Sequence, residues 1–142
     1  MTLRRIVYGS HACEHFSEKA LEQILIHARV RNEQRGITGV LLFADFSFLQ
    51  VIEGSAEALD ELLTVLRRDE RHDGLLVLLD EAIETRSFPD WRMGYKRLDT
   101  IEESVPGFAR LLESGGEPEL LATVSKKVSA LVAGFRQVTG TR

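Results

Sequence analysis

The chain has 142 residues, is 44% hydrophobic and carries a net charge of -4, which suits one domain with its own core. Its basic residues are spread out, so charge gives no reason to expect binding to nucleic acid or to an anionic membrane. No apolar run approaches the roughly 20 residues of a membrane helix, and the N-terminus lacks the apolar segment of a signal peptide. The single cysteine, Cys13, excludes an internal disulfide, and we expect a soluble cytoplasmic protein.

The first predicted element is a strand over residues 3–9. Ile6 and Tyr8 share one of its faces, because strand side chains alternate. We expect this strand to lie centrally in its sheet, since a crossover connection follows it. A tyrosine there most often packs in the core with its hydroxyl satisfied by a neighbour. The functional alternative is that the phenol, which is both donor and acceptor, faces a ligand.

Residues 10–16, SHACEHF, are expected to form a loop. His11, Cys13 and His15 lie two residues apart in it, a pattern that invites a metal assignment. A structural zinc site needs four ligands, and the sequence offers no second cysteine and no obvious fourth ligand nearby. We therefore predict no metal site.

A helix is predicted over residues 18–34, with Ser17 as its N-cap and Gly36 where a C-terminal cap belongs. Asn32 continues the apolar stripe of this helix at a spacing of four, although an amide is polar. The stripe consists of Leu21, Leu25, Ala28 and Asn32.

Two adjacent strands follow, the first over residues 37–44, with a tight reversal at Ala44-Asp45. The first strand is an almost unbroken apolar run, which is typical of a strand covered on both faces. In the second strand, Gln50 is the polar member of a row that otherwise contains Phe46, Phe48 and Ile52.

Asn32 and Gln50 are thus two amides on faces that we expect to be buried. A buried amide without hydrogen-bond partners costs roughly 1–3 kcal/mol, so two of them close together suggest a polar, planar ligand between helix and sheet. The alternative is that each amide bonds to a nearby backbone group. These two residues alone favour that alternative, because most side-chain hydrogen bonds go to backbone or water.

A second helix is predicted over residues 56–68, and a further strand is predicted over residues 74–83. A short last strand is predicted over residues 91–98, and it carries Trp91 and Met93, which more often fill a core than act in function. Between helix and strand, charged residues either cap the helix in solvent or form a rim that meets the polar tail of a ligand. They are Arg67, Arg68, Asp69, Arg71 and His72.

This order predicts an α+β fold with a ferredoxin-like βαββαββ mixed five-stranded sheet and two helices on one face. Two C-terminal helices, over residues 105–114 and 117–136, can supply a cover for the other face. We expect a first domain of residues 1–99 and a C-terminal helical extension of residues 100–142. An apolar stripe on the last helix could pack on the sheet, pair with another copy or dock a partner. It consists of Leu121, Val124, Val128, Leu131 and Phe135.

Positions spread over residues 2–98 together match one known pattern. They are Tyr8; Arg29, Asn32 and Gly36-Ile37-Thr38-Gly39; Phe48, Gln50 and Glu53-Gly54; Asp69, Arg71 and His72; and Phe88, Trp91, Met93 and Gly94. In order, spacing and residue type the sequence resembles the BLUF family, the domains that sense blue light using FAD.

The resemblance implies a flavin ring between the two helices, against the sheet. Asn32 would bond to the edge carbonyl and imide of the ring, and Gln50 would bridge Tyr8 and the flavin. Tyr8 would give an electron and a proton to the excited flavin and then recover them. Gln50 would return in an altered hydrogen-bonding state, by rotation or tautomerisation, which suits an amide with both a donor and an acceptor. Trp91 or Met93 would pass the change to the C-terminal helices.

The implied cofactor is FAD, and FMN or riboflavin is also compatible because no GxGxxG or Walker-type loop specifies a phosphate cradle. Ala28 stands where many family members have a serine, and Arg31 replaces a common second asparagine. These departures bear on the lifetime of the lit state more than on flavin binding. The residues expected to contact the flavin are Tyr8, Ile24, Ala28, Arg31, Asn32, Phe48, Gln50, Leu66, Asp69, Arg71 and His72.

By this resemblance the chain is a short stand-alone photoreceptor and not an enzyme, with residues 1–99 as its flavin-binding domain. We expect its output to pass through a homo-oligomer or through an unidentified effector protein that meets residues 100–142. One alternative is a flavin-free interaction module of the same fold. The other is a flavin-dependent redox enzyme, for which the sequence shows no additional acid, base or nucleophile.

Overall fold

The computed structural model describes residues 2–12, 17–44, 47–68, 72–88, 92–97, 101, 105–114 and 116–136. Within these ranges, no helix has the length and apolar character needed to cross a membrane. The strands and helices follow one another in the predicted order. They are β1 (Leu3–Ala12), α1 (Glu18–Arg35), β2 (Thr38–Ala44), β3 (Ser47–Ser55), α2 (Ala56–Arg67), β4 (His72–Ile83), β5 (Gly94–Arg97), α4 (Phe108–Ser114) and α5 (Pro118–Arg136).

The described strands form one five-stranded sheet in the order β4-β1-β3-β2-β5. β1 lies in the interior of the sheet and runs antiparallel to both of its neighbours, β3 and β4. β2 and β3 form an antiparallel hairpin, and β5 adds to β2 in parallel at the edge. The predicted mixed, ferredoxin-like sheet and the interior position of its first strand are confirmed.

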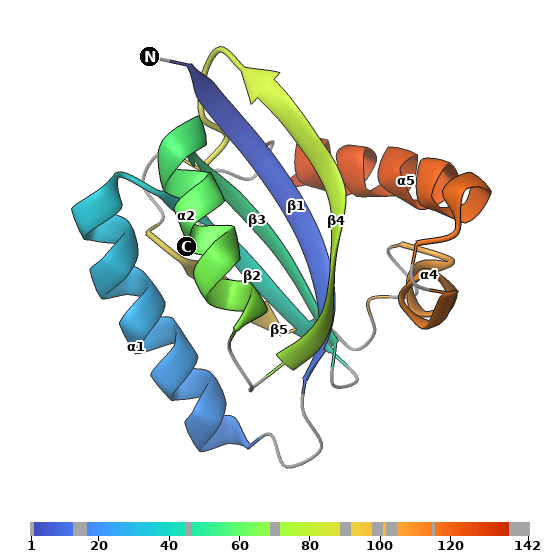
Figure 1. Ribbon diagram of the computed structural model, residues 1–142, viewed down its shortest axis with the longest axis horizontal. Coiled ribbons are helices and arrows are strands. Elements are labelled where there is room, and N and C mark those ends of the chain that lie inside the picture. The colour runs from blue at the N-terminus through green and yellow to red at the C-terminus, as the bar shows by residue number, and fades with distance from the viewer. Residues whose placement is uncertain are drawn as a thin grey trace.

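The helices cover both faces of this sheet, with α1 and α2 on one side and α4 and α5 on the other (Figure 1). The alternation of each strand divides the core into two layers. The α1/α2 layer includes Ile6, Tyr8, Phe48, Ile52 and Leu59. The α4/α5 layer includes Val7, Leu49, Val51, Phe108, Val124 and Val128. Of the three uses considered for the apolar stripe of α5, the structure shows packing on the sheet.

Both ends of α1 form as predicted. Ser17 Oγ accepts a hydrogen bond from the Ala20 N–H at 3.1 Å. Gly36 ends the helix in the left-handed region, at φ 67°, where a residue with a side chain would be strained. Between these caps the predicted stripe is buried, with Asn32 in the last turn. The caps therefore set the ends of α1, and the buried stripe identifies the face that turns toward the sheet.

Four predicted boundaries are wrong. β1 continues to Ala12, although residues 10–12 were expected in a loop, and β4 begins at His72 rather than at residue 74. The two strands pair along these extensions, and this pairing overrides the weak strand preference of the local sequence. β5 begins at Gly94 and not at residue 91, so Met93 precedes the last strand. α4 begins at Phe108, three residues later than predicted.

Candidate functional site

The pairing of β1 with β3 brings two predicted residues side by side. Tyr8 and Gln50 are direct cross-strand partners, and the Tyr8 hydroxyl donates a hydrogen bond to Gln50 Oε1. The residues are only 1% and 7% exposed, respectively. Water is therefore a poor substitute for either partner, and the two groups depend on each other.

The amide nitrogen of Gln50 has a different partner. Its Nε2 donates to Met93 Sδ at 3.2 Å. A thioether sulfur accepts hydrogen bonds but cannot donate them, whereas a phenol does both. Only the orientation with Oε1 toward Tyr8 and Nε2 toward Met93 therefore satisfies both contacts of the amide. The three side chains form a directional chain.

Residues on α1 hold the backbone of the segment that carries Met93. Arg29 Nε donates to the Met93 carbonyl oxygen at 3.1 Å, and Asn32 Nδ2 donates to the Arg92 carbonyl oxygen at 2.5 Å. The two donors lie three residues apart, so they project from neighbouring turns of the helix. No specific role was predicted for Arg29, which helps to place Met93 against Gln50.

A pocket lies beside the Tyr8–Gln50 pair, between the sheet, α1 and α2. Its empty space, including the part that is open to solvent, is about 460 Å³. The ring of Phe48 on its wall is supported by Phe43, with ring centroids 5.1 Å apart. The lining is mostly apolar, with a few polar groups, which suits an aromatic ligand with polar edges. It consists of Tyr8, Ser10, Ile24, His27, Ala28, Arg31, Leu41, Phe48, Gln50 and Leu66.

The buried polar atoms without a hydrogen-bond partner within the described parts of the chain include Asn32 Oδ1 and Ser10 Oγ. Asn32 is 0% and Ser10 1% exposed. Turning the Asn32 amide over would not help, because its oxygen would then face the Arg92 carbonyl oxygen. Unpaired buried groups cost roughly 1–3 kcal/mol each. A ligand that donates to the amide oxygen and bonds to the hydroxyl would remove that cost.

Ser10 was not predicted as a site residue. Ser10 was expected in a loop, whereas it continues β1 and follows Tyr8 by two residues on the same face. Extending the alternation of Ile6 and Tyr8 past Gly9 would have found it.

Most of the predicted flavin contacts come together at the pocket. Asn32 is not part of its wall, although it is close in sequence to Ala28 and Arg31, which are. Within the described residues, no three potential metal ligands are grouped. The predicted contacts that line the pocket are Tyr8, Ile24, Ala28, Arg31, Phe48, Gln50 and Leu66. The predictions that lie outside the described residues concern Cys13, His15, Asp69, Arg71, Trp91 and the side chain of His72.

The fold and the site define a class of protein: an α+β domain that can hold a planar cofactor between two helices and a sheet, against a tyrosine–glutamine pair. The family described as "Sensors of blue-light using FAD" matches residues 3–94. The chain belongs to this family, the BLUF domains.

Known relatives agree with this assignment. The photoactivated adenylate cyclase subunit beta of Euglena gracilis is 34% identical over 101 residues, 70% of this chain but 12% of the relative. The blue light- and temperature-regulated antirepressor BluF of Escherichia coli (strain K12) is 31% identical over 86 residues, 61% of this chain and 21% of the relative. The dark-state structure of BlrB, a BLUF protein, has a TM-score of 0.69 and 35% identity, and the match covers 91% of this chain and 96% of BlrB. The chain thus spans a small part of these two curated relatives and nearly all of BlrB.

The protein is therefore a blue-light sensor with FAD as the cofactor of its family. The described residues fit a flavin. Asn32 Oδ1 and Ser10 Oγ have no hydrogen-bond partner among the described residues, and Ser10 lies in the pocket wall. An imide N–H requires an acceptor of the kind that Asn32 Oδ1 offers. The apolar lining suits the body of the ring system, because aromatic surface is stabilised by burial against apolar side chains.

Proposed function

We propose that Tyr8 and Gln50 are the photoactive residues of this sensor. When bound, the flavin absorbs blue light and becomes a strong electron acceptor. Tyr8 gives up an electron and its phenolic proton, and later recovers both. The observation that carries this proposal is the buried hydrogen bond from the Tyr8 hydroxyl to Gln50 Oε1 at the pocket wall. In this hydrogen bond, Gln50 Oε1 is an acceptor next to the phenolic oxygen from which the Tyr8 proton must leave.

Rotation of the Gln50 amide gives the site a second state. After half a turn, Nε2 can donate to the Tyr8 oxygen, but Met93 Sδ faces an oxygen and has no donor. Met93 is thus the contact that distinguishes the two states. One neutral hydrogen bond contributes about 0.5–1.5 kcal/mol, enough to shift a population without unfolding the domain. Trp91, the other residue proposed for the relay, lies outside the described residues.

We assign the remaining flavin contacts to three groups of residues. Asn32 meets the imide edge of the ring, where its free oxygen accepts a hydrogen bond. The wall of the ring site consists of Ile24, Ala28, Arg31, Phe48 and Leu66. The ribityl and phosphate end belongs to Arg68, Arg71 and His72, with Asp69 as a further contact between them in the sequence.

The output is the regulation of an effector protein in the cytoplasm, without turnover of a substrate by this domain. The family match ends at residue 94, which supports a sensor domain of residues 1–99 and an extension of residues 100–142. We propose that the extension serves self-association and effector docking. The names of two relatives, an adenylate cyclase and an antirepressor, show that related sensors are coupled to different outputs.

The test is the absorption spectrum of the purified protein in the dark, after blue light and during recovery. We expect a flavin spectrum that shifts slightly to the red and then returns. Gln50→Ala should bind flavin and show no shift, whereas Gln23→Ala, at an exposed position of α1, should behave like the wild type. A normal light-induced shift in Gln50→Ala would overturn the mechanism.

Two other results would favour the alternatives. A wild-type flavin spectrum that bleaches under light, together with turnover of an electron donor in the dark, would indicate a redox enzyme. Absence of chromophore even after FAD is added would indicate an interaction module, in which Asn32 and Gln50 have structural roles.

A further inference from the structure

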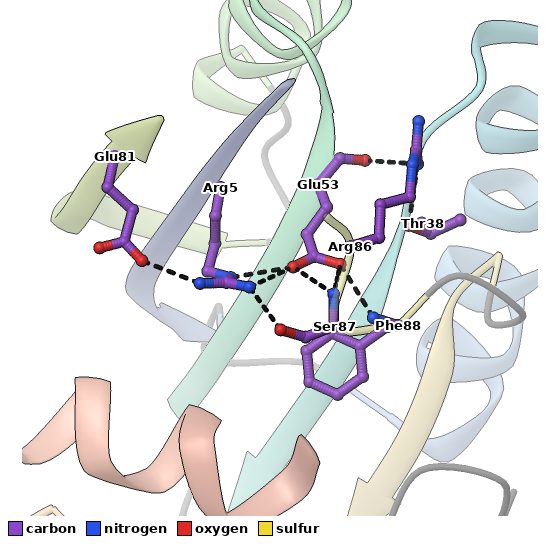
Figure 2. Close-up of polar contacts among 7 residues, drawn as sticks. All are labelled: Arg5, Thr38, Glu53, Glu81, Arg86, Ser87 and Phe88. Carbon is purple, nitrogen blue, oxygen red and sulfur yellow. Dashed lines mark hydrogen bonds and ion pairs between the residues drawn. The ribbon is translucent and has the colours of Figure 1, made fainter. Parts of the chain in front are cut away.

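On the face of β3 opposite to Gln50 lies a buried ion pair. Glu53 is 0% and Arg5 7% exposed. Arg5 Nε donates to Glu53 Oε2 at 2.9 Å, and its terminal nitrogen lies 2.8 Å from the same oxygen. Arg5 also bonds to Glu81 on β4 at 2.8 Å, so one guanidinium joins β1 to both neighbouring strands (Figure 2).

Glu53 also binds the start of the connection from β4 to β5. Its carboxylate accepts the Ser87 N–H at 2.9 and 3.0 Å and the Phe88 N–H at 2.9 Å. The Ser87 hydroxyl accepts a further hydrogen bond from Arg5. A buried carboxylate is tolerated only when it is paired and hydrogen-bonded. Two backbone donors and a guanidinium meet that requirement here.

Arg86 attaches the same segment to two more elements. It donates to Thr38 Oγ1 on β2 at 2.9 Å, to the Glu53 carbonyl oxygen at 3.1 Å and to the Gly36 carbonyl oxygen at 2.7 Å. Residues 86–88 are thereby tied to β1, β2, β3 and the end of α1. We call Arg5, Glu53, Arg86 and Ser87 the Glu53 anchor.

The other end of this connection carries Met93, the partner of Gln50. Gln50 and Glu53 are three residues apart on β3, about 10 Å along the strand, and they contact opposite ends of one connection. At the Met93 end, β3 contributes one neutral hydrogen bond, from Gln50 to sulfur, and α1 contributes one bond each from Arg29 and Asn32 to backbone carbonyls. At the Phe88 end, β3 contributes a buried carboxylate that accepts two backbone N–H groups and is paired with Arg5.

We propose that Glu53 is a positioning residue that fixes the 86–88 end of the β4–β5 connection, so that a change at Gln50 displaces only the Met93 end and β5. The inference rests on the proposed function of Gln50. If residues 86–88 were not fixed, a small change at Met93 would shift the whole β4–β5 connection and would displace β5 less. With Glu53 in place, residues 86–88 keep their position while Met93 and β5 are displaced.

The dark-state test is amide hydrogen exchange of the flavin-loaded protein, resolved by residue. Glu53→Gln keeps the shape of the side chain but places an NH2 group against backbone donors. We expect the Ser87 and Phe88 amides to exchange about 10 to 100 times faster in Glu53→Gln than in the wild type. The control is Glu81→Gln, which removes another carboxylate from Arg5 without touching the connection, and it should leave these amides unchanged. Equal effects of the two substitutions, or no effect of Glu53→Gln, would overturn the proposal that Glu53 fixes residues 86–88.

The light-state test uses the wild type first, so it stands even if Glu53→Gln does not fold. Blue light should change exchange at residues 93–97 and leave Ser87 and Phe88 as they are in the dark. In Glu53→Gln the light-induced change should spread into residues 86–88. Equal light-induced changes at both ends of the wild-type connection would overturn the proposal. A protein that shows no spectral shift refutes the proposed photochemistry instead, and the dark-state result for Glu53 still stands.

Discussion

The two faces of β3 differ in the kind of hydrogen bond that each one makes. On the α1/α2 face, Gln50 joins Tyr8 and Met93 through neutral groups, and Asn32 Oδ1 and Ser10 Oγ have no hydrogen-bond partner among the residues that the structure describes. On the α4/α5 face, Glu53 is ionic and has a partner for each carboxylate oxygen. One strand therefore carries a site that is incomplete without its ligand and, three residues away, a site that is complete.

This difference separates the hydrogen bonds that can rearrange, around Gln50, from the ion pair that keeps the structure in place, around Glu53. A neutral hydrogen bond contributes about 0.5–1.5 kcal/mol, so its rearrangement is within the reach of a modest signal. Removal of one partner from a buried ion pair costs about 3–5 kcal/mol, so such a pair does not exchange partners under the same signal. We infer that the face that senses light must be weakly bonded, and that its geometry is kept by strong bonds on the other face.

Loss of the anchor should have the largest effect on stability. Glu53→Ala leaves the buried amides of Ser87 and Phe88 without their acceptor and removes one of the two carboxylates that pair with Arg5, so we expect a loss of about 3–5 kcal/mol in the free energy of unfolding. Urea denaturation measures it. Asp80→Ala, which breaks a more exposed ion pair of β4 with Arg4, should cost at most about 1 kcal/mol. Similar losses in the two variants would mean that the Glu53 network adds no special support.

Removal of the phenolic hydroxyl should affect light sensing far more than folding. Tyr8→Phe deprives Gln50 Oε1 of its donor, with an expected loss of about 1 kcal/mol in the free energy of unfolding. The light-induced red shift should disappear, because the residue has no phenolic proton to give. Tyr95→Phe changes the other tyrosine of the chain and should keep the shift. Difference spectra decide between the residues, and a shift that survives in Tyr8→Phe would exclude the proposed role.

The free hydroxyl of Ser10 predicts effects of opposite sign on cofactor and fold. Ser10→Ala should weaken flavin binding by about 3 to 10 times, the loss expected for one neutral hydrogen bond. The flavin-free protein should be as stable as the wild type or slightly more stable, because an unpaired buried group is gone. Flavin titration and thermal unfolding measure the two effects. Ser125→Ala removes a hydroxyl that is bonded to the Leu78 carbonyl oxygen, so it should lower stability and leave flavin affinity unchanged.

The smallest change concerns the sulfur atom of Met93. Met93→Leu keeps the side-chain volume, so the free energy of unfolding should change by less than about 1.5 kcal/mol. The red shift should still form. Dark recovery should be slower by up to about tenfold, because leucine cannot accept from Gln50 and so does not favour its dark orientation. Recovery at the wild-type rate would show that the sulfur contact does not distinguish the two states of the amide.

Much of this architecture follows from the pattern of residues. The spacing of four along α1 and the alternation on β3 correctly placed Asn32 and Gln50 on buried faces. The caps Ser17 and Gly36 set the helix ends. These features are local, so periodicity and cap preference are enough to predict them. Family resemblance was needed to connect Gln50 with Tyr8, because their cross-strand register is a property of the folded sheet.

The Glu53 anchor was beyond the reach of the sequence. A glutamate in a strand indicates an exposed position, since acidic residues are rarely fully buried. Its partners Arg5 and Ser87 are 48 and 34 residues away along the chain, and no local pattern announces such contacts. Ser10 was missed for a simpler reason, because the strand was predicted to end at Gly9, whereas β1 continues and pairs Ser10 with Phe48 of β3.

Gly9, the residue after the candidate photoactive Tyr8, has no side chain, so α4 packs directly against the backbone of β1 there. A Cβ atom at this position would lie 2.6 Å from Phe108 Cε1, so the aromatic ring of α4 occupies the space where a side chain of β1 would otherwise be. Tyr8 is the preceding residue, and its side chain is in the opposite core layer. A displacement of the backbone at Tyr8 would therefore press directly on the C-terminal helices. A change at Tyr8 can therefore reach α4 directly through the sheet, in addition to the route from Gln50 through Met93 to the edge strand β5.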